Sequence, residues 1–228
     1  YKCRFCVKSL REKNGDMDRA FFSRVIREMR AAGVEELGMF YIGESFSAPA
    51  VLSSAIAWCK RALRFPYVFC TTNGSMARPE VVLDCMEAGL DSLKFSINAA
   101  DNDQFEAVMG VKSKLFIRAL ENLKAARSVR DNGGFKCGIY ASSIQFAGEQ
   151  AAKMQALLDE RVLPFVDQHY FLPLFGQMAQ VDEARAEELG FVPTAGNQGR
   201  IGALRQPLPC WAVSTEGHVR ADGHLSAC

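Results

Sequence analysis

The 228-residue chain has almost no excess of charge, since 27 Lys and Arg stand against 26 Asp and Glu. Without a basic excess, its electrostatics point to neither nucleic acid nor an anionic membrane as a partner. We find no apolar run near the roughly 20 residues of a membrane span, and no secretory signal. The eight cysteines are too sparse for a secreted disulfide scaffold. These absences predict a cytoplasmic protein whose thiols are reduced or bound to metal.

What the chain does have is an alternation of strand and helix patterns. Strands that alternate with helices predict right-handed crossovers and a parallel α/β sheet. Five strands are expected, and a strand before Tyr1 would be the sixth. The expected strands cover 37–42, 67–72, 92–97, 135–141 and 165–175, and the expected helices cover 21–29, 48–63, 79–88, 115–129 and 147–162.

The alternation stops after residue 175. A short charged helix is expected over 182–189, and the Gly-, Gln- and Pro-rich stretch that follows is typical of a linker. From Cys210 onward, turn signals at Gly217 and Asp222-Gly223 predict a hairpin. We therefore expect one domain over 1–180, a linker over 181–209 and the start of a second domain over 210–228. Tyr1 and Cys228 both stand within cysteine motifs, so we expect a piece of a longer protein.

Cys3 and Cys6 form a C-x-x-C pair just before the first helix. Two thiolates at this spacing can share a metal or an iron–sulfur cluster. The pair alone is also compatible with a zinc half-site, a redox dithiol or chance. Its position favours a ligand, because ligands of parallel α/β sheets bind beyond the carboxyl ends of the strands.

The chain resembles the radical S-adenosylmethionine (radical SAM) superfamily, whose C-x3-C-x2-C motif follows the first barrel strand. Cys3 and Cys6 match the second and third cysteines, and Phe5 matches an aromatic that lies near the adenine of SAM. The first cysteine would lie upstream of Tyr1. The resemblance covers roughly residues 1–175 and implies a partial (β/α)6 TIM-like barrel with a 4Fe–4S cluster.

Three further matches follow expected strands. Gly43 and Glu44 fit the turn that holds the SAM amino group in the family, although the neighbouring residues depart from its Gly-Gly-Glu-Pro pattern. The next strand ends in Thr71-Thr72-Asn73-Gly74, a common family ending. The strand after it ends in Ser96-Ile97-Asn98, where the family has a polar pair near the SAM ribose and carboxylate. The alternatives are a helix-start charge for Glu44 and turn roles for Ser96 and Asn98.

Two positions extend this comparison. Many relatives place an arginine on the SAM carboxylate where this chain has Val108 and Met109, and Lys112 is the nearest cation. Leu172, on the last expected strand, is also placed at the SAM site by the resemblance. The resemblance thus implies that SAM is bound by residues Phe5, Gly43, Glu44, Thr72, Asn73, Ser96, Asn98, Lys112 and Leu172.

Cys210 and Cys228 enclose Gly223 in a C-x(9–15)-G-x4-C pattern. This pattern is similar to the opening of the SPASM or twitch extension, a small β-hairpin domain that holds one or two auxiliary iron–sulfur clusters. A disulfide or a zinc site are the alternatives. The other four cysteines, Cys59, Cys70, Cys85 and Cys137, are expected to be buried.

His169 is expected to be a hydrogen-bonded core residue, or else it, Asp167, Gln168 or Tyr170 faces the barrel interior, depending on which side of the strand points inward.

The resemblance implies an enzyme that cleaves SAM reductively and abstracts a hydrogen from a peptide, protein or small-molecule substrate. It also implies a reductant such as flavodoxin or ferredoxin. A non-catalytic zinc or cluster-binding α/β module would explain the cysteines at both edges, but not the three polar strand endings together. A barrel that has lost its chemistry is a third reading, because Ile42, Met109 and the missing first cysteine depart from the family pattern.

Overall fold

The protein is described by a computed structural model that covers residues 1, 3, 16–40, 43–172, 174–175, 193–194 and 216–226. The predictions for Phe5, Cys6, Cys210, Cys228 and the helix at 182–189 lie outside these residues. The description therefore covers most of the expected barrel and the expected C-terminal hairpin.

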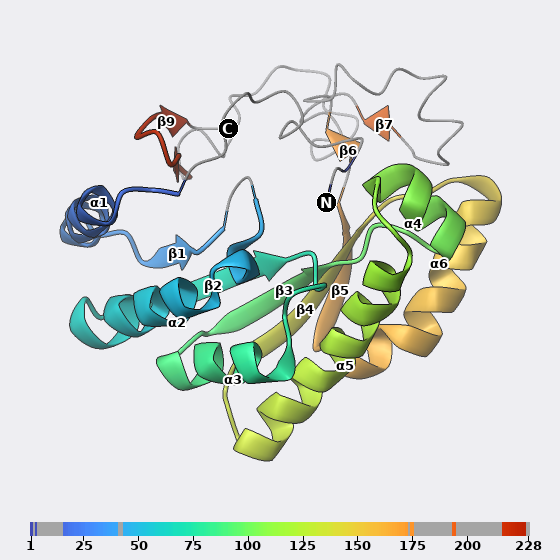
Figure 1. The fold of residues 1–228 in the computed structure, drawn as a ribbon, viewed down its shortest axis with the longest axis horizontal. Coiled ribbons are helices and arrows are strands. Elements are labelled where there is room, and N and C mark those ends of the chain that lie inside the picture. The colour runs from blue at the N-terminus through green and yellow to red at the C-terminus, as the bar shows by residue number, and fades with distance from the viewer. Residues whose placement is uncertain are drawn as a thin grey trace, which may run out of the picture.

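Five parallel strands form the main sheet in the order in which they occur along the chain (Figure 1). Each strand pairs in parallel with the next, which confirms the predicted α/β fold with parallel strands. The strands are β1 (Glu36–Gly38), β2 (Tyr67–Thr72), β3 (Ser92–Ser96), β4 (Gly138–Ile144) and β5 (Gln168–Leu172).

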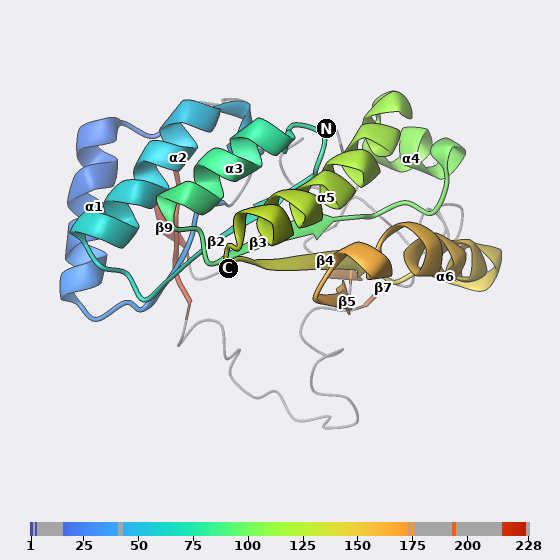
Figure 2. The same cartoon turned by 90° about the horizontal axis from the view of Figure 1, so that it is seen from below.

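Helices connect the strands and gather along one side of the sheet (Figures 1 and 2). Helix α2 continues into a π-helical turn, and helix α4 was not expected from the sequence. The helices are α1 (Arg19–Ala31), α2 (Pro49–Ala57), α3 (Pro79–Ala88), α4 (Asn102–Met109), α5 (Lys114–Gly133) and α6 (Gly148–Arg161), with short turns η2 (Ser45–Ser47), η3 (Trp58–Ala62) and η4 (Leu163–Phe165).

The two faces of the sheet have different chemistry. Side chains that face the helices are buried and mostly apolar, as in Val68, Cys70, Leu93, Phe95 and Ile139. Alternate residues point to the opposite face, here called the open face, because successive side chains of a strand point to opposite sides. The register aligns Thr71, Lys94 and Tyr140 across this open face.

Strand β4 begins three residues later than expected. The reason is helix α5, which continues through Gly133 and ends at Gly134 in a left-handed conformation. The N–H of Phe135 then bonds to the carbonyl of Arg130 at 3.0 Å, so Phe135 still belongs to the helix end. The end of the helix therefore includes Phe135, which the sequence pattern had assigned to the strand.

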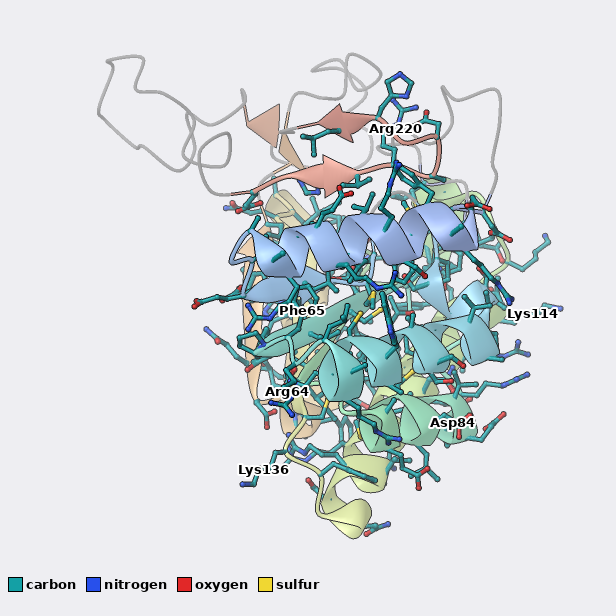
Figure 3. All side chains as sticks on the ribbon, turned by 90° about the vertical axis from the view of Figure 1, so that its left-hand side faces the viewer. Arg64, Phe65, Asp84, Lys114, Lys136 and Arg220 are labelled. Carbon is teal, nitrogen blue, oxygen red and sulfur yellow. The ribbon has the colours of Figure 1, made fainter. Side chains whose placement is uncertain are left out.

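The predicted C-terminal hairpin is present. Strands β8 (His218–Val219) and β9 (Leu225–Ser226) pair antiparallel around Asp222-Gly223. The turn approaches α1, since a Cβ added at Gly223 would lie 3.4 Å from the ring of Phe21. Figure 3 shows Arg220 on this hairpin, beside α1. The two short strands β6 (Leu174–Phe175) and β7 (Pro193–Thr194) form a separate parallel pair.

Within the described residues, no helix is both long and apolar enough to cross a membrane.

Candidate functional site

A cleft of about 190 Å³ opens at the carboxyl ends of β2 and β3. This is the position at which parallel α/β sheets bind ligands. Its wall contains most of the residues expected to hold SAM or the cluster, namely Cys3, Gly43, Glu44, Thr72, Asn73, Ser96 and Asn98. Residues from four separate stretches of the chain therefore meet at one place.

Glu44 connects the two halves of the cleft wall. Its Oε1 accepts hydrogen bonds from the Thr72 hydroxyl at 2.7 Å and from the N–H of Phe46 at 3.1 Å. Its Oε2 accepts one from the N–H of Asn73 at 2.8 Å. The carboxylate thus caps η2, as the helix-start alternative predicted, and also ties η2 to the end of β2. Oε2 keeps a second lone pair for a further donor, such as an ammonium group.

The turn after β2 is held by its own side chains. The Asn73 Oδ1 accepts from the N–H and the hydroxyl of Ser75, at 3.0 and 2.7 Å. Gly74 has a φ of +80°, and an added Cβ would lie 3.0 Å from both Ala119 and Phe95. The buried Asn122 amide donates to the Gly74 carbonyl at 2.7 Å. Only glycine allows this close approach of the turn to α5.

The two threonines at the end of β2 have different environments. Thr72 is buried on the helix side, and its hydroxyl donates to Glu44 and accepts from the N–H of Gly74 at 3.0 Å. Thr71 points to the open face and also lines the cleft. Its Oγ1 is buried and has no hydrogen-bond partner among the described residues. The hydroxyl that is available to a ligand is therefore that of Thr71, whereas the sequence pointed to Thr72.

Ser96 and Asn98 both line the cleft, but their hydrogen bonding differs. The Asn98 Oδ1 accepts from the N–H of Ile144 at 3.0 Å, which fixes the end of β4 against the loop after β3. Its amide nitrogen has no hydrogen bond to a described residue, and neither has the Ser96 hydroxyl. Asn98 therefore fulfils the turn role and still offers donors to the cleft.

Tyr1 and Cys3 bring the N-terminal segment to the same cleft. The Tyr1 hydroxyl lies 3.4 Å from the Asn73 carbonyl oxygen and 3.5 Å from that of Leu115. Its ring meets Phe105 edge to face, with centroids 5.4 Å apart. Burial raises the pKa of Tyr1 to about 12, so the phenol stays protonated. These contacts hold Cys3 at the edge of the cleft.

The sequence analysis did not predict an apolar wall for the cleft, although it placed Met109 where relatives have an arginine at the SAM carboxylate. This wall comes from α4 and α5, which contribute Phe105, Met109 and Phe116. A capping signal was present, because the Asp101 side chain accepts from the N–H of Gln104 at 2.8 Å and Gly110 ends α4 in a left-handed conformation. The pattern Asp101-x-x-Gln104 is a variant of a helix-start box.

Two predicted residues are not brought to the cleft. The Lys112 side chain is 81% exposed, and its nearest charged neighbour among the described residues is Glu106, at 3.9 Å. Leu172 pairs with Ile144 at the sheet edge and is outside the cleft wall. Met109 occupies the wall in a buried position instead, so among the described lining residues the only charged side chain is Glu44.

The four interior cysteines are buried, as expected. Burial raises the pKa of Cys59, Cys85 and Cys137 to about 12, and it raises that of Cys70 further. The Cys70 thiol donates to the Met39 carbonyl at 3.3 Å. Thiols in this state are poor ligands, because metals bind the thiolate.

His169 faces the helix side of the sheet. Its Nε2 lies 3.0 Å from the Ser143 hydroxyl, and burial lowers its pKa. Asp167 pairs with Arg130 at the start of β5. Tyr170 is the residue of this strand whose ring reaches Lys94 on the open face.

A family model described as the radical SAM superfamily matches residues 1–141, more than half of the chain. The chain belongs to the radical SAM superfamily. Membership implies a 4Fe–4S cluster and SAM as the family's ligands. Among curated proteins, none matches the chain.

Solved structures show the same fold. The chain is similar to Streptococcus suis SuiB bound to its precursor peptide SuiA, with a TM-score of 0.66, 16% identity, and coverage of 100% of this chain and 56% of that one. For SuiB bound to S-adenosylmethionine the TM-score is 0.57 at 15% identity, with coverage of 100% and 57%. The chain therefore spans little more than half of SuiB.

The residues of the cleft fit the radical SAM ligands. Cys3 supplies a sulfur, the donor that iron–sulfur clusters require. Within the described part of the chain, no three His, Cys, Asp or Glu side chains converge on one point, so a cluster here needs ligands from elsewhere in the protein. Glu44, Ser96 and Asn98 supply a carboxylate, a hydroxyl and an amide, which suit an ammonium and a ribose.

Proposed function

We propose that the whole protein cleaves S-adenosylmethionine reductively and uses the resulting radical to oxidise or otherwise modify a substrate. The observation that supports this most directly is the meeting of Cys3, Glu44, Ser96 and Asn98 in one cleft at the carboxyl ends of the strands. When bound, the cluster would supply the one electron that cleaves a carbon–sulfur bond of SAM to methionine and a 5′-deoxyadenosyl radical, the species that would take a hydrogen atom from the substrate.

The chain's own residues would bind and orient. Cys3, with Cys6 from outside the described residues, would hold the cluster. The remaining lone pair of Glu44 Oε2 would accept from the SAM ammonium, and Ser96 and Asn98 would bond to the ribose. The apolar wall of Phe105, Met109 and Phe116 would keep water from the radical.

The remaining assignments extend this proposal. A peptide substrate is supported by the likeness to SuiB, whose structure contains its precursor peptide; a protein or a small molecule would use the same chemistry. Phe5 would lie near the adenine. Cys210 and Cys228 would begin a SPASM or twitch domain after the linker over 181–209, with one or two auxiliary clusters. The reductant would be a flavodoxin or ferredoxin in the cytoplasm.

The test is anaerobic reconstitution of the full-length protein, followed by reduction and measurement of 5′-deoxyadenosine. We expect the parent protein to release it, and we expect a Cys3→Ala, Cys6→Ala variant to lose both iron and activity. A Cys59→Ala, Cys85→Ala variant is the matched control, because both thiols are buried away from the cleft and should keep the iron. Cleavage at the parent rate by the Cys3, Cys6 variant would overturn the assignment. Stoichiometric zinc in place of iron and sulfide would favour the non-catalytic module.

A further inference from the structure

A lysine stands at the centre of the open face of the sheet. Lys94, on β3, is aligned with Thr71 of β2 and Tyr140 of β4. Its Nζ lies 5.8 Å from the ring centroid of Phe40, which follows β1, and 5.6 Å from that of Tyr170, on β5. The ammonium is thus held above the middle of the sheet by rings from both sides, an arrangement that favours a cation.

This cation has no anionic partner among the described residues. Lys60, the other half-buried lysine on a neighbouring element, pairs with Asp91 at 2.7 Å. Within the described part of the chain, the contacts of the Lys94 ammonium are those to the two aromatic rings. A partly buried charge without a counter-ion is costly, so such a position favours an anion supplied by a ligand.

An unused hydroxyl group lies next to Lys94 on the same face. The Oγ1 of Thr71 is buried and has no hydrogen-bond partner in the described part of the chain. Thr71 is the register neighbour of Lys94 and lines the cleft. Buried hydroxyls in proteins nearly always have a partner. An ammonium and a neighbouring hydroxyl donor match the lone pairs of one carboxylate.

The side chains packed around Lys94 limit the direction from which a ligand can approach it. Toward the amino ends of the strands, aromatic side chains fill the open face. The Tyr67 hydroxyl donates to Ser92 at 2.8 Å, and a Cβ added at Gly138 would lie within 3 Å of the Tyr140 ring. Toward the carboxyl ends, Phe40, Thr71 and Ser96 are part of the cleft wall. A ligand therefore approaches Lys94 from the cleft.

We propose that Lys94 and Thr71 bind a carboxylate of the substrate. Lys94 lies deeper in the sheet than Glu44 and Asn98, which stand after the strand ends, so its ligand lies beyond the groups assigned to SAM. The carboxylate site is argued from the structure alone. Only the identification of its ligand as the substrate rests on the proposed function. For a peptide substrate, the carboxylate belongs to an aspartate, a glutamate or the C-terminus.

The test is acetylation of lysines in the full-length protein, followed residue by residue by mass spectrometry. N-acetylglycine is the carboxylate probe, and N-acetylglycinamide is its neutral counterpart. We expect N-acetylglycine to slow the acetylation of Lys94 severalfold and the amide to have no effect. Lys136 is the internal control, because it is exposed and lies far from the hairpin side of the molecule in Figure 3. Equal effects of the two probes, no effect of either, or protection by inorganic phosphate alone would overturn the proposal.

A variant of the hydroxyl tests the site itself. In a Thr71→Val variant, the N-acetylglycine concentration that half-protects Lys94 should rise about tenfold, as expected for a lost hydrogen bond to a charged group. Ser143→Ala is the control, because the Ser143 hydroxyl is buried, faces the helices and bonds to His169. An unchanged half-protection concentration in Thr71→Val would contradict the proposal.

A competing role for Lys94 is to hold the carboxylate of SAM. Titration of SAM and of decarboxylated SAM into Lys94→Met and Lys94→Arg separates the two roles. The proposal predicts that both ligands bind both variants within about twofold of the parent affinity. Weaker binding of SAM to Lys94→Met, with unchanged binding of decarboxylated SAM, would assign Lys94 to SAM and overturn the proposal. Because the acetylation test needs no turnover, a protein that fails to cleave SAM would refute the proposed function alone.

Discussion

At the scale of single residues, Glu44 serves the fold as well as the cleft. Its carboxylate accepts three hydrogen bonds, from Thr72, from the N–H of Asn73 and from the N–H of Phe46. From the sequence, Glu44 could be interpreted either as a ligand of SAM or as a charge at the start of a helix. The structure shows the capping role directly, and Oε2 keeps one lone pair that could accept from a further donor.

Glu44→Gln should therefore affect both stability and binding. The substitution turns one acceptor oxygen into a donor that faces an N–H or O–H group. We expect the free energy of unfolding to fall by about 1–3 kcal/mol. If Glu44 also binds the SAM ammonium, SAM affinity should fall roughly 10- to 150-fold. Urea unfolding and isothermal titration measure the two effects.

Asp91→Asn is the matched control for Glu44. Asp91 also accepts from a backbone N–H, that of Val68 at 2.7 Å, and pairs with Lys60, but it lies at the amino ends of the strands. It should lose comparable stability and bind SAM normally. If Glu44→Gln loses stability and keeps full SAM affinity, the carboxylate is structural only.

At the scale of secondary-structure elements, the cleft depends on how closely α5 approaches the turn after β2. Gly74 permits this contact, because it has a left-handed conformation and no side chain between Phe95 and Ala119. Asn122 of α5 then bonds to its carbonyl. The helix that supplies Phe116 to the cleft is thereby fixed to the strand end that supplies Thr71.

Gly74→Ala should destabilise the protein by about 2–4 kcal/mol, because left-handed strain adds to steric overlap. Gly134→Ala is the comparison, since Gly134 also has a left-handed conformation, at φ +64°, but no atom lies within 4 Å of its added Cβ. It should lose only about 1–2 kcal/mol. Urea unfolding measures both. Equal losses in the two variants would show that the packing of α5 against this turn adds nothing.

At the scale of the whole molecule, the cysteines fall into groups with different chemistry. Cys59, Cys70, Cys85 and Cys137 lie in the hydrophobic core between the sheet and its helices. Cys3 lies in the cleft wall. The fold thus separates the interior thiols from the cysteine assigned to the cluster.

Alkylation with iodoacetamide at pH 8 should reflect this separation. A rise in pKa from 9 to about 12 lowers the thiolate fraction of Cys59, Cys85 and Cys137 roughly a thousandfold, and burial slows the reaction further. We expect these three and Cys70 to remain unmodified in the native protein and to react readily in urea. Mass spectrometry reads each site. Fast native labelling of Cys70 would show that the end of β2 opens to solvent.

Much of this molecule could be predicted from local sequence. The bounds of β2 and α3 match the expectation at both ends, because clear turn and helix-stop residues flank them. Helix α4 was missed because the apolar periodicity of its eight residues is weak. Its capping residues are the local signal that could have predicted it. With this helix, the sequence analysis missed Phe105 in the wall of the cleft, although it had placed Met109 where relatives have an arginine.

The sequence by itself determined the parallel α/β order and the placement of Asn73, Ser96 and Asn98 at strand ends, because hydrophobic period and turn residues are local properties. The strand before Glu44 ends at Gly38 rather than at residue 42, and Glu44 caps η2 instead. Only the tertiary structure decided that, among the described residues, Thr71 rather than Thr72 has an unpartnered hydroxyl, and that Lys94 lies over Phe40 of the cleft wall while Lys112 is exposed. Which face of a strand is covered depends on register and on the helices packed against it, and a shift by one residue exchanges the two faces.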